Sequence, residues 1–357
     1  MSRKHYIIPI FVPHEGCPHN CVFCNQDKIT GINEKVDAAY TINTIEKYIK
    51  TIPRENSTIE VSFFGGTFTA IPIERQNSFL KVAKDYKDKG IIDYIHMSTR
   101  PDYIDEDILD NLKKYSVDII ELGVQSLDEE VLLKSGRGHS IDSVYKASKL
   151  IKDYGITLGH QIMLGLPSDS FKKDIETVRK SIEMKPDIAR IYPALVIKQT
   201  PMEYMLNEGI YKPYTLEEAI DITKILYSMY VANDVQVIRI GLQPTEEINK
   251  DRELVEGPFH PAFRELVEGK IMNEMILDNI IKNYKKTVEI TINNKDLSKL
   301  YCNKKKYFKE YLGKYTVKVV QSNELERGSI ILSIENHKRK LSLLEYMLKL
   351  NKEVKSI

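Results

Sequence analysis

Short apolar runs alternate with amphipathic segments from residue 6 to about residue 245. The apolar runs indicate strands, and the segments with apolar positions at helical spacing indicate helices. Such alternation is typical of a parallel sheet whose strands are joined through helices. The predicted strands are 7–11, 59–64, 94–98, 119–124, 157–164, 188–194 and 235–240. The predicted helices are 40–52, 72–88, 105–115, 142–154, 170–184 and 215–232.

Seven strands with intervening helices predict an α/β fold, a partial or complete (β/α) barrel. An open doubly wound sheet is the alternative. Both architectures place their chemistry at the carboxyl ends of the strands. Glycine and polar residues lie at or after those ends, and we expect them to meet at one edge of the sheet. These residues are Gly65, Gly66, Thr67, Arg100, Gln125, Arg137 and Gln161.

The pattern changes at residues 256–261, where one glycine and two prolines indicate a linker. We therefore predict a barrel domain over residues 1–255 and a small α+β domain over 256–357. In the second domain we expect helices at 262–284, 295–312 and 341–350, a strand at 287–292, and a strand pair formed by 315–320 and 329–334.

Charge is distributed unevenly along the chain. Residues 270–357 contain 19 Lys and Arg against 10 Asp and Glu, a net charge of +9, whereas the whole chain has +1. A basic appendage on an acidic body indicates binding of a polyanion such as RNA. The alternative is that the lysines only solvate helices. Lys304–Lys309 interleaves lysines with aromatics, which fits an amphipathic helix better than a base-stacking surface.

Three of the four cysteines form the pattern C-x3-C-x2-C at Cys17, Cys21 and Cys24. Thiolates select zinc, copper(I) or iron–sulfur clusters. A structural zinc site takes four ligands, whereas three thiolates leave one iron of a 4Fe–4S cluster open. The low cysteine content and the strand-like start of the chain indicate a cytoplasmic protein with reduced thiols. Cys302 is expected to be a buried thiol.

The cysteine pattern, with the aromatic Phe23 before the last cysteine, resembles the radical S-adenosylmethionine (SAM) superfamily. The resemblance implies that Cys17, Cys21 and Cys24 hold a 4Fe–4S cluster and that SAM binds its fourth iron. Reductive cleavage of SAM then yields a 5′-deoxyadenosyl radical, with the electron supplied by a donor such as ferredoxin or flavodoxin. It also implies that Phe23 lies near the adenine; core packing under the loop is the alternative, and the two roles are compatible.

Further segments resemble the radical domain of the Elongator catalytic-subunit family over residues 6 to about 245. Two features depart from that family. The first two cysteines are closer together than usual, and no glycine-rich pyrophosphate loop of an acetyltransferase domain follows residue 245. Radical generation is therefore the expected chemistry, rather than the Elongator reaction itself. The matching segments are 64–68, 99–102, 121–126, 137–139, 161–167, 191–197 and 209–214.

The resemblance implies that Gly65 and Gly66 approach the amino and carboxylate ends of SAM, beside Thr67. A tight strand exit that needs a positive φ is the alternative for these glycines. Arg100 and Arg137 are suited to bidentate binding of a carboxylate, although surface ion pairs would also explain them.

Gln125 and Gln161 lie in apolar strands, where a buried amide must find partners. A ribose, an adenine edge or a neighbouring side chain would serve. His160 should point to the opposite face of its strand from Gln161 and is predicted to be a packed histidine.

These observations predict a cytoplasmic radical SAM enzyme that modifies RNA, either tRNA or rRNA. One alternative is the same chemistry on a small metabolite or peptide, with the C-terminal domain as a lid or a dimerisation module. An alternative of another class is a non-enzymatic, zinc-binding RNA adaptor.

Overall fold

The computed structural model describes residues 4–12, 17, 19–25, 36–242, 252–280, 287–335 and 337–354. Its residues form two compact units. The first contains residues 1–213 and 244–257, and the second contains 214–243 and 258–357. The compact units divide the chain differently from the predicted domain boundary at residue 255, which stays a prediction.

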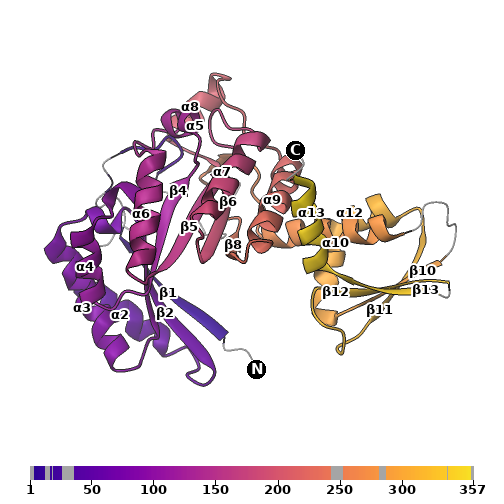
Figure 1. Cartoon of the computed structure of the whole chain (residues 1–357), viewed down its shortest axis with the longest axis horizontal. Coiled ribbons are helices and arrows are strands. Elements are labelled where there is room, and N and C mark those ends of the chain that lie inside the picture. Colours follow the sequence, from indigo (N-terminus) through magenta and orange to yellow (C-terminus); the bar gives the residue numbers. More distant parts are fainter. Residues whose placement is uncertain are drawn as a thin grey trace. The chain divides into compact units, whose positions relative to one another are not determined.

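Seven parallel strands form the large sheet in the order β1-β2-β3-β4-β5-β6-β8 (Figure 1). The order follows the chain, whereas the order of a doubly wound sheet reverses at a switch point. All seven predicted strands are present, and the predicted partial barrel is confirmed. The strands are β1 Lys4–Val12, β2 Ser57–Gly65, β3 Tyr94–Thr99, β4 Ile119–Gln125, β5 Thr157–Leu164, β6 Ile188–Pro193 and β8 Gln236–Ile240.

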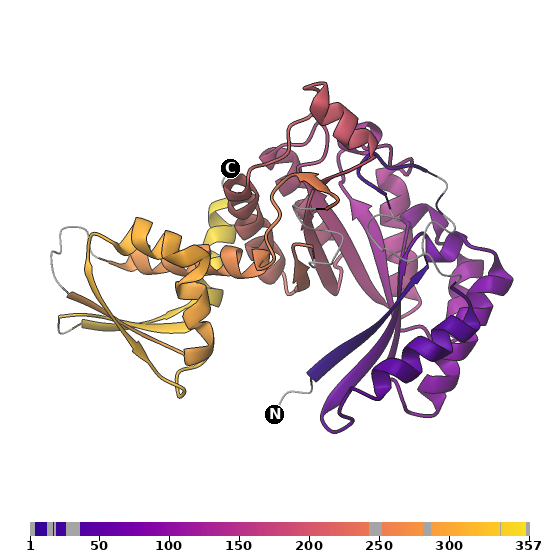
Figure 2. The ribbon, with the colours of Figure 1, turned by 180° about the vertical axis from the view of Figure 1, so that it is seen from behind.

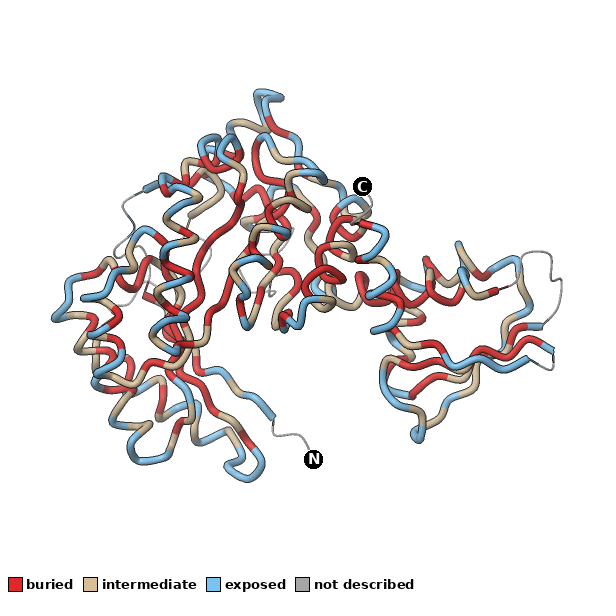
Figure 3. Tube along the Cα trace, in the orientation of Figure 1, coloured by how far each residue is buried: buried red, intermediate tan, exposed pale blue. Residues whose placement is uncertain are grey.

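Helices of the first unit cover one face of this sheet (Figures 1 and 2). The other face carries polar side chains, which are described below. The strand residues facing the helices are almost entirely buried, as the red segments of Figure 3 show. Asp37, Asp105, Ser140 and Ser170 cap four of the helices by accepting backbone N–H groups. The helices are α2 Ala38–Ile49, α3 Ile73–Asp88, α4 Glu106–Lys114, α6 Ile141–Asp153 and α7 Phe171–Glu183.

Several short elements of the first unit were not predicted from the sequence. Two are helices, α5 Glu129–Lys134 and α8 Pro201–Asn207, and two are the antiparallel strands β7 Val196–Ile197 and β9 Leu254–Glu256. Single 3₁₀ turns follow β2 and β3. They are η1 Phe68–Ala70 and η2 Pro101–Tyr103.

The second unit contains the helices α9 Leu216–Val231, α10 Phe263–Asn279 and α13 Leu343–Val354 beside a four-stranded sheet. The predicted helix over 295–312 is wrong in its continuity. It is divided into η3 Asn294–Asp296, α11 Leu297–Leu300 and α12 Cys302–Leu312. Three residues inside α12 have left-handed backbone angles that break it: Asn303, Lys304 and Lys305.

The sheet of the second unit has the order β11-β10-β12-β13. The predicted pairing of the strands near 315–320 and 329–334 is wrong, because β10 lies between them. β13 was not predicted, since its first four residues are charged or polar and exposed and show no alternation. The strands are β10 Thr287–Ile292, β11 Thr316–Gln321, β12 Ser329–Ile334 and β13 His337–Ser342.

The predicted amphipathic role of the aromatics in α12 is confirmed for Tyr307, which is 1% exposed. Its hydroxyl donates to Glu217. Cys302 is buried as predicted, and burial raises the pKa of its thiol to about 12. Among the described residues, no helix is both long enough and apolar enough to cross a membrane.

Candidate cluster and cofactor site

The cysteine loop follows β1 and is held by backbone hydrogen bonds on both sides of Val22. The amide of Val22 donates to the carbonyl of Ser135 at the end of α5 (3.1 Å), and its carbonyl accepts from Met202 at the start of α8 (2.9 Å). Within the loop, the amide of Cys24 donates to the carbonyl of Cys21 (3.0 Å). The two short helices therefore fix the segment that carries the last two cysteines.

Two predicted site residues contact sulfur atoms of the loop. The Thr67 hydroxyl lies 3.3 Å from Cys17 Sγ. Arg137 Nη1 donates to Cys21 Sγ at 3.4 Å. Cys17 is exposed and Cys21 is buried. The described part of the chain contains no group of three His, Cys, Asp or Glu side chains placed to hold one metal ion, so the thiolate triad rests on spacing and on this anchoring.

Gly65 ends β2 with a backbone angle φ of +112°, and a Cβ there would lie 2.6 Å from the carbonyl oxygen of Val12. The next amide, that of Gly66, donates to the same oxygen at 2.9 Å. The tight strand exit predicted as the alternative role is therefore present. The contact of Gly65 and Gly66 with SAM stays a prediction, and Thr67 is placed directly after them.

Arg137 and Gln125 lie together over Gly123 of β4. Arg137 Nη2 donates to the carbonyl of Gly123. A Cβ on Gly123 would lie 3.0 Å from Gln125 Nε2 and 3.3 Å from Arg137 Nη2. Both side chains are buried, and neither Gln125 Oε1 nor Arg137 Nε has a hydrogen-bond partner among the described residues. Buried polar atoms are normally satisfied, so the missing partners indicate a bound polar molecule.

Arg100 binds a carboxylate of the protein itself. Its Nε and Nη2 donate to the two oxygens of Asp102 at 3.0 and 2.8 Å. Burial alone would raise the pKa of Asp102, but the guanidinium of Arg100 lowers it below its usual value. This is the ion pair predicted as the alternative, although its guanidinium is buried and only the Asp102 side of the pair reaches the surface. A contact between Arg100 and SAM stays a prediction.

His139 was not singled out from the sequence, although it ends a matching segment that begins at Arg137. Its side chain is buried, and neither ring nitrogen has a partner among the described residues. Burial and the neighbouring charge of Arg137 lower its pKa to about 3. His139 is therefore neutral at physiological pH, with one donor and one acceptor to offer.

Phe23 packs against a buried apolar cluster, which confirms the predicted core packing. A contact with adenine stays a prediction. The cluster consists of Val131, Leu166, Ala194, Val196, Met202 and Tyr211.

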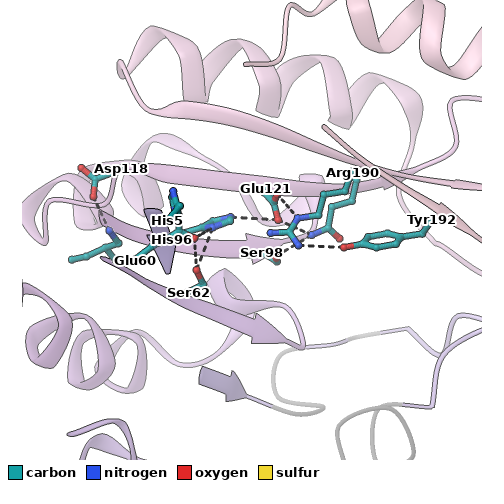
Figure 4. A network of polar contacts seen from close by, with 11 residues as sticks. His5, Glu60, Ser62, His96, Ser98, Asp118, Glu121, Arg190 and Tyr192 are labelled. Atoms are coloured by element: carbon teal, nitrogen blue, oxygen red, sulfur yellow. Dashed lines mark hydrogen bonds and ion pairs between the residues drawn. The ribbon is translucent and has the colours of Figure 1, made fainter. Parts of the chain in front are cut away.

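A row of alternating charges crosses the polar face of the sheet (Figure 4). We call Glu60, His96, Glu121 and Arg190 the polar row; they come from β2, β3, β4 and β6. Glu60 lies 2.6 Å from His96 Nδ1, His96 Nε2 lies 3.4 Å from Glu121, and Arg190 Nε donates to Glu121 at 2.7 Å. Successive side chains of a strand point to opposite faces of the sheet. These four side chains lie on the same face, each contributed by a different strand.

The polar row is fully ionised at neutral pH. Burial alone would lower the pKa of His96, but Glu121 and Glu60 raise it to about 9. Burial would likewise raise the pKa of Glu121, but His96 and Arg190 lower it to about 2. The pKa of Glu60 is lowered by hydrogen bonds from His5 and His96 against the effect of burial. Two carboxylates thus balance two cations.

Gln161 contacts the polar row through Glu121. Its Nε2 donates to Ser98 (3.1 Å) and Glu121 (3.0 Å), so a neighbouring side chain is the partner that it finds. Its contact with SAM stays a prediction. His160 is the packed histidine that was predicted: Ser148 and Ser181 bond its two nitrogens, and burial lowers its pKa to about 3.

The residues around the cysteine loop fit a cluster with a polar organic ligand. Three thiols on one loop form a soft donor set. Beside them, Gln125, Arg137 and His139 present buried polar atoms that lack partners in the described structure. Buried polar groups are normally satisfied, so their clustering here indicates a place for a polar molecule.

The fold and this site together define a radical SAM enzyme. The family described as the radical SAM superfamily matches residues 11–180, and the radical SAM C-terminal domain matches residues 186–273. The chain belongs to the radical SAM superfamily. The cofactors of that superfamily are a 4Fe–4S cluster and SAM.

The chain is similar to archaeal proteins, one of which is a tRNA-modifying enzyme by name. The tRNA uridine(34) acetyltransferase of Methanocaldococcus jannaschii is 30% identical over 60% of this chain and 47% of its own length. The uncharacterized protein MJ0486 of the same organism is 30% identical over 61% of this chain and 69% of its own length. The chain thus spans about half the length of the acetyltransferase relative.

Among solved structures, the archaeal Elp3 of Methanocaldococcus infernus, with an N-terminal deletion of residues 1–46, matches with a TM-score of 0.63. It is 26% identical, over 77% of this chain and 64% of that chain. The predicted resemblance to the Elongator radical domain is therefore confirmed.

Proposed function

We propose that Cys17, Cys21 and Cys24 hold a 4Fe–4S cluster at which SAM is reductively cleaved, and that the resulting radical initiates modification of a tRNA. The observation that carries the proposal is the cysteine loop, which is held by backbone hydrogen bonds. Thr67 and Arg137 contact two of its three sulfurs. When bound, the cluster and SAM supply the 5′-deoxyadenosyl radical.

The residues of the chain bind, orient and shield these cofactors. The three thiolates would bind iron, with Thr67 and Arg137 holding two sulfurs in place. Gln125 Oε1 would accept a hydrogen bond from SAM, and the neutral ring of His139 would donate one and accept another. The buried apolar cluster that packs against Phe23 would keep bulk water away from one side of the loop.

An RNA substrate is supported by the tRNA-acting relative and by the basic C-terminal region. Lys338, Arg339 and Lys340 are exposed and adjacent on β13, an edge strand of the sheet in the second unit. Lysine and arginine on an exposed edge suit contacts with phosphates. We therefore propose that the second unit contacts the RNA backbone.

Anaerobic reconstitution tests the radical chemistry. The wild-type protein should bind about four irons and release 5′-deoxyadenosine when SAM and dithionite are added. Cys24→Ser should bind less iron and form no 5′-deoxyadenosine, whereas Cys302→Ser, remote in sequence from the loop, should behave as wild type. A colourless wild-type protein that holds one zinc instead would refute the proposal in favour of the zinc adaptor.

Incubation with RNA tests the substrate class. Unfractionated tRNA should raise the yield of 5′-deoxyadenosine, and mass spectrometry of the digested tRNA should show a nucleoside of altered mass. Binding of tRNA should weaken steeply with salt, as expected of phosphate contacts. A reconstituted enzyme that cleaves SAM but binds no RNA would point to a metabolite or a peptide instead.

A further inference from the structure

Arg137 is directed at a cysteine sulfur and not at a carboxylate. Its Nη1 donates to Cys21 Sγ at 3.4 Å, and its Nη2 donates to the carbonyl of Gly123. Each of these two nitrogens thus has at least one of its two N–H bonds engaged by the protein itself. Nε has no partner among the described residues.

The position of this guanidinium is built into the surrounding backbone. Arg137 stands between Gly136 and Gly138, whose φ angles are +64° and +72°. Gly136 packs on the cysteine loop, since a Cβ there would lie 3.3 Å from the carbonyl oxygen of Asn20. Gly123 carries no side chain that would displace the guanidinium. The side chain of Arg137 therefore lies between the cysteine loop and β4, and Gly136 and Gly138 flank it in the chain.

The positive charge of Arg137 is not neutralised by a carboxylate of the described residues, so it acts on the Cys21 sulfur. Arg100, its buried counterpart, is neutralised by the carboxylate of Asp102. The described residues give Arg137 a thiol and a carbonyl as partners but no carboxylate. Cys21 is 6% exposed, so water screens the interaction little.

We infer that Arg137 tunes the reduction potential of the cluster by donating a charged hydrogen bond to the Cys21 thiolate. Hydrogen bonds to the ligating sulfurs are among the determinants of iron–sulfur potentials. Reduction adds one electron to the cluster from a low-potential donor, and a nearby cation stabilises the more negative state. Arg137 therefore raises the potential and is a positioning residue for the first electron transfer. The inference rests on the proposed cluster at the three cysteines.

Redox titration of the reconstituted protein, followed by EPR, tests this role. Arg137→Met should retain its iron but have a lower midpoint potential. We expect the ratio of reduced to oxidised cluster at a fixed potential to fall about tenfold, a shift of about 59 mV for one electron. In deuterated buffer, pulsed EPR should detect an exchangeable deuteron coupled to the reduced wild-type cluster that weakens in this variant.

Arg75→Met is the matched control, because Arg75 also donates to a backbone carbonyl, that of Val36, but belongs to α3. Its potential should equal that of the wild type. If Arg137→Met assembles no cluster, Arg137→Gln, which keeps an amide donor and loses the charge, takes its place and should also show a lower potential. A fully loaded variant with the wild-type potential overturns the inference, whereas a wild-type protein without a cluster overturns the proposed function instead.

Discussion

At the scale of single residues, the buried charges of the polar row stabilise one another because negative and positive side chains alternate along it. Glu121 is fully buried, yet it lies between His96 and Arg190. Burying an unpaired ion costs several kcal/mol, so each member of the polar row depends on its neighbours. Strand periodicity places such residues on one face of a sheet. The sequence alone does not give the neighbours, since they depend on strand order and register.

His96 should make the stability of the protein depend on pH. Its pKa rises from 6.5 to about 9 on folding, so its contribution is fully present below pH 6.5 and is lost as the pH rises through 9. We expect the free energy of unfolding to fall by on the order of 3 kcal/mol across this window. Urea unfolding at pH 6 and at pH 9.5 measures the change.

His96→Gln is the comparison for this experiment. The variant should be less stable than the wild type at pH 6, because Glu60 and Glu121 lose the cation between them. Its stability should change much less between the two pH values, since the other titrating groups are common to both proteins. Equal pH dependence of the two proteins would show that His96 is neutral in the folded state.

At the scale of elements, long strands and helices were predictable and the short ones were not. The helices α5 and α8 have 6 and 7 residues, too few for an amphipathic period to be recognised. Their stability comes from tertiary contacts rather than from propensity. These two helices hold the cysteine loop at Val22. The cysteine spacing therefore predicted the chemistry of the site, whereas its support became visible only in three dimensions.

Gly65 should be essential to the junction of β1 and β2. Gly65→Ala would place a methyl group 2.6 Å from the backbone oxygen of Val12, so a strand must move. Left-handed strain adds about 1–2 kcal/mol to the cost of that clash. We expect a total loss of about 3 kcal/mol in thermal or urea unfolding. We also expect a lower iron content after reconstitution, because the cysteine loop follows β1.

Gly90→Ala separates the clash from the strain. Gly90 also has a positive φ, +65°, but a Cβ there would meet no atom within 4 Å. This variant should lose only about 1–2 kcal/mol and bind iron as the wild type does. If both variants lost the same stability and kept the same iron, the close approach of Gly65 to β1 would have no role at the site.

At the scale of the whole molecule, the superfamily is established for the barrel, whereas the RNA substrate is a proposal that rests partly on charge. The match to the superfamily covers most of the barrel. Most residues near the cysteine loop could also be named from the sequence alone. The basic character of residues 270–357 was also evident, but its distribution over a surface was not. Exposed Lys338, Arg339 and Lys340 lie on β13, a strand that hydrophobic periodicity could not reveal.

If β13 contacts RNA phosphates, the salt dependence of binding should report it. Lys338→Glu with Lys340→Glu should weaken binding of labelled tRNA and make the negative slope of log K against log salt shallower by about 1.4, because each phosphate contact contributes about 0.7 on single strands. Lys146→Glu with Lys149→Glu changes the net charge equally on exposed positions of α6 and should leave the slope unchanged. Equal slopes for the two double variants would place the phosphate contacts elsewhere. A reduced slope for the β13 variant alone, with 5′-deoxyadenosine formation in the absence of RNA unaffected, would assign substrate binding to the second unit and radical formation to the first.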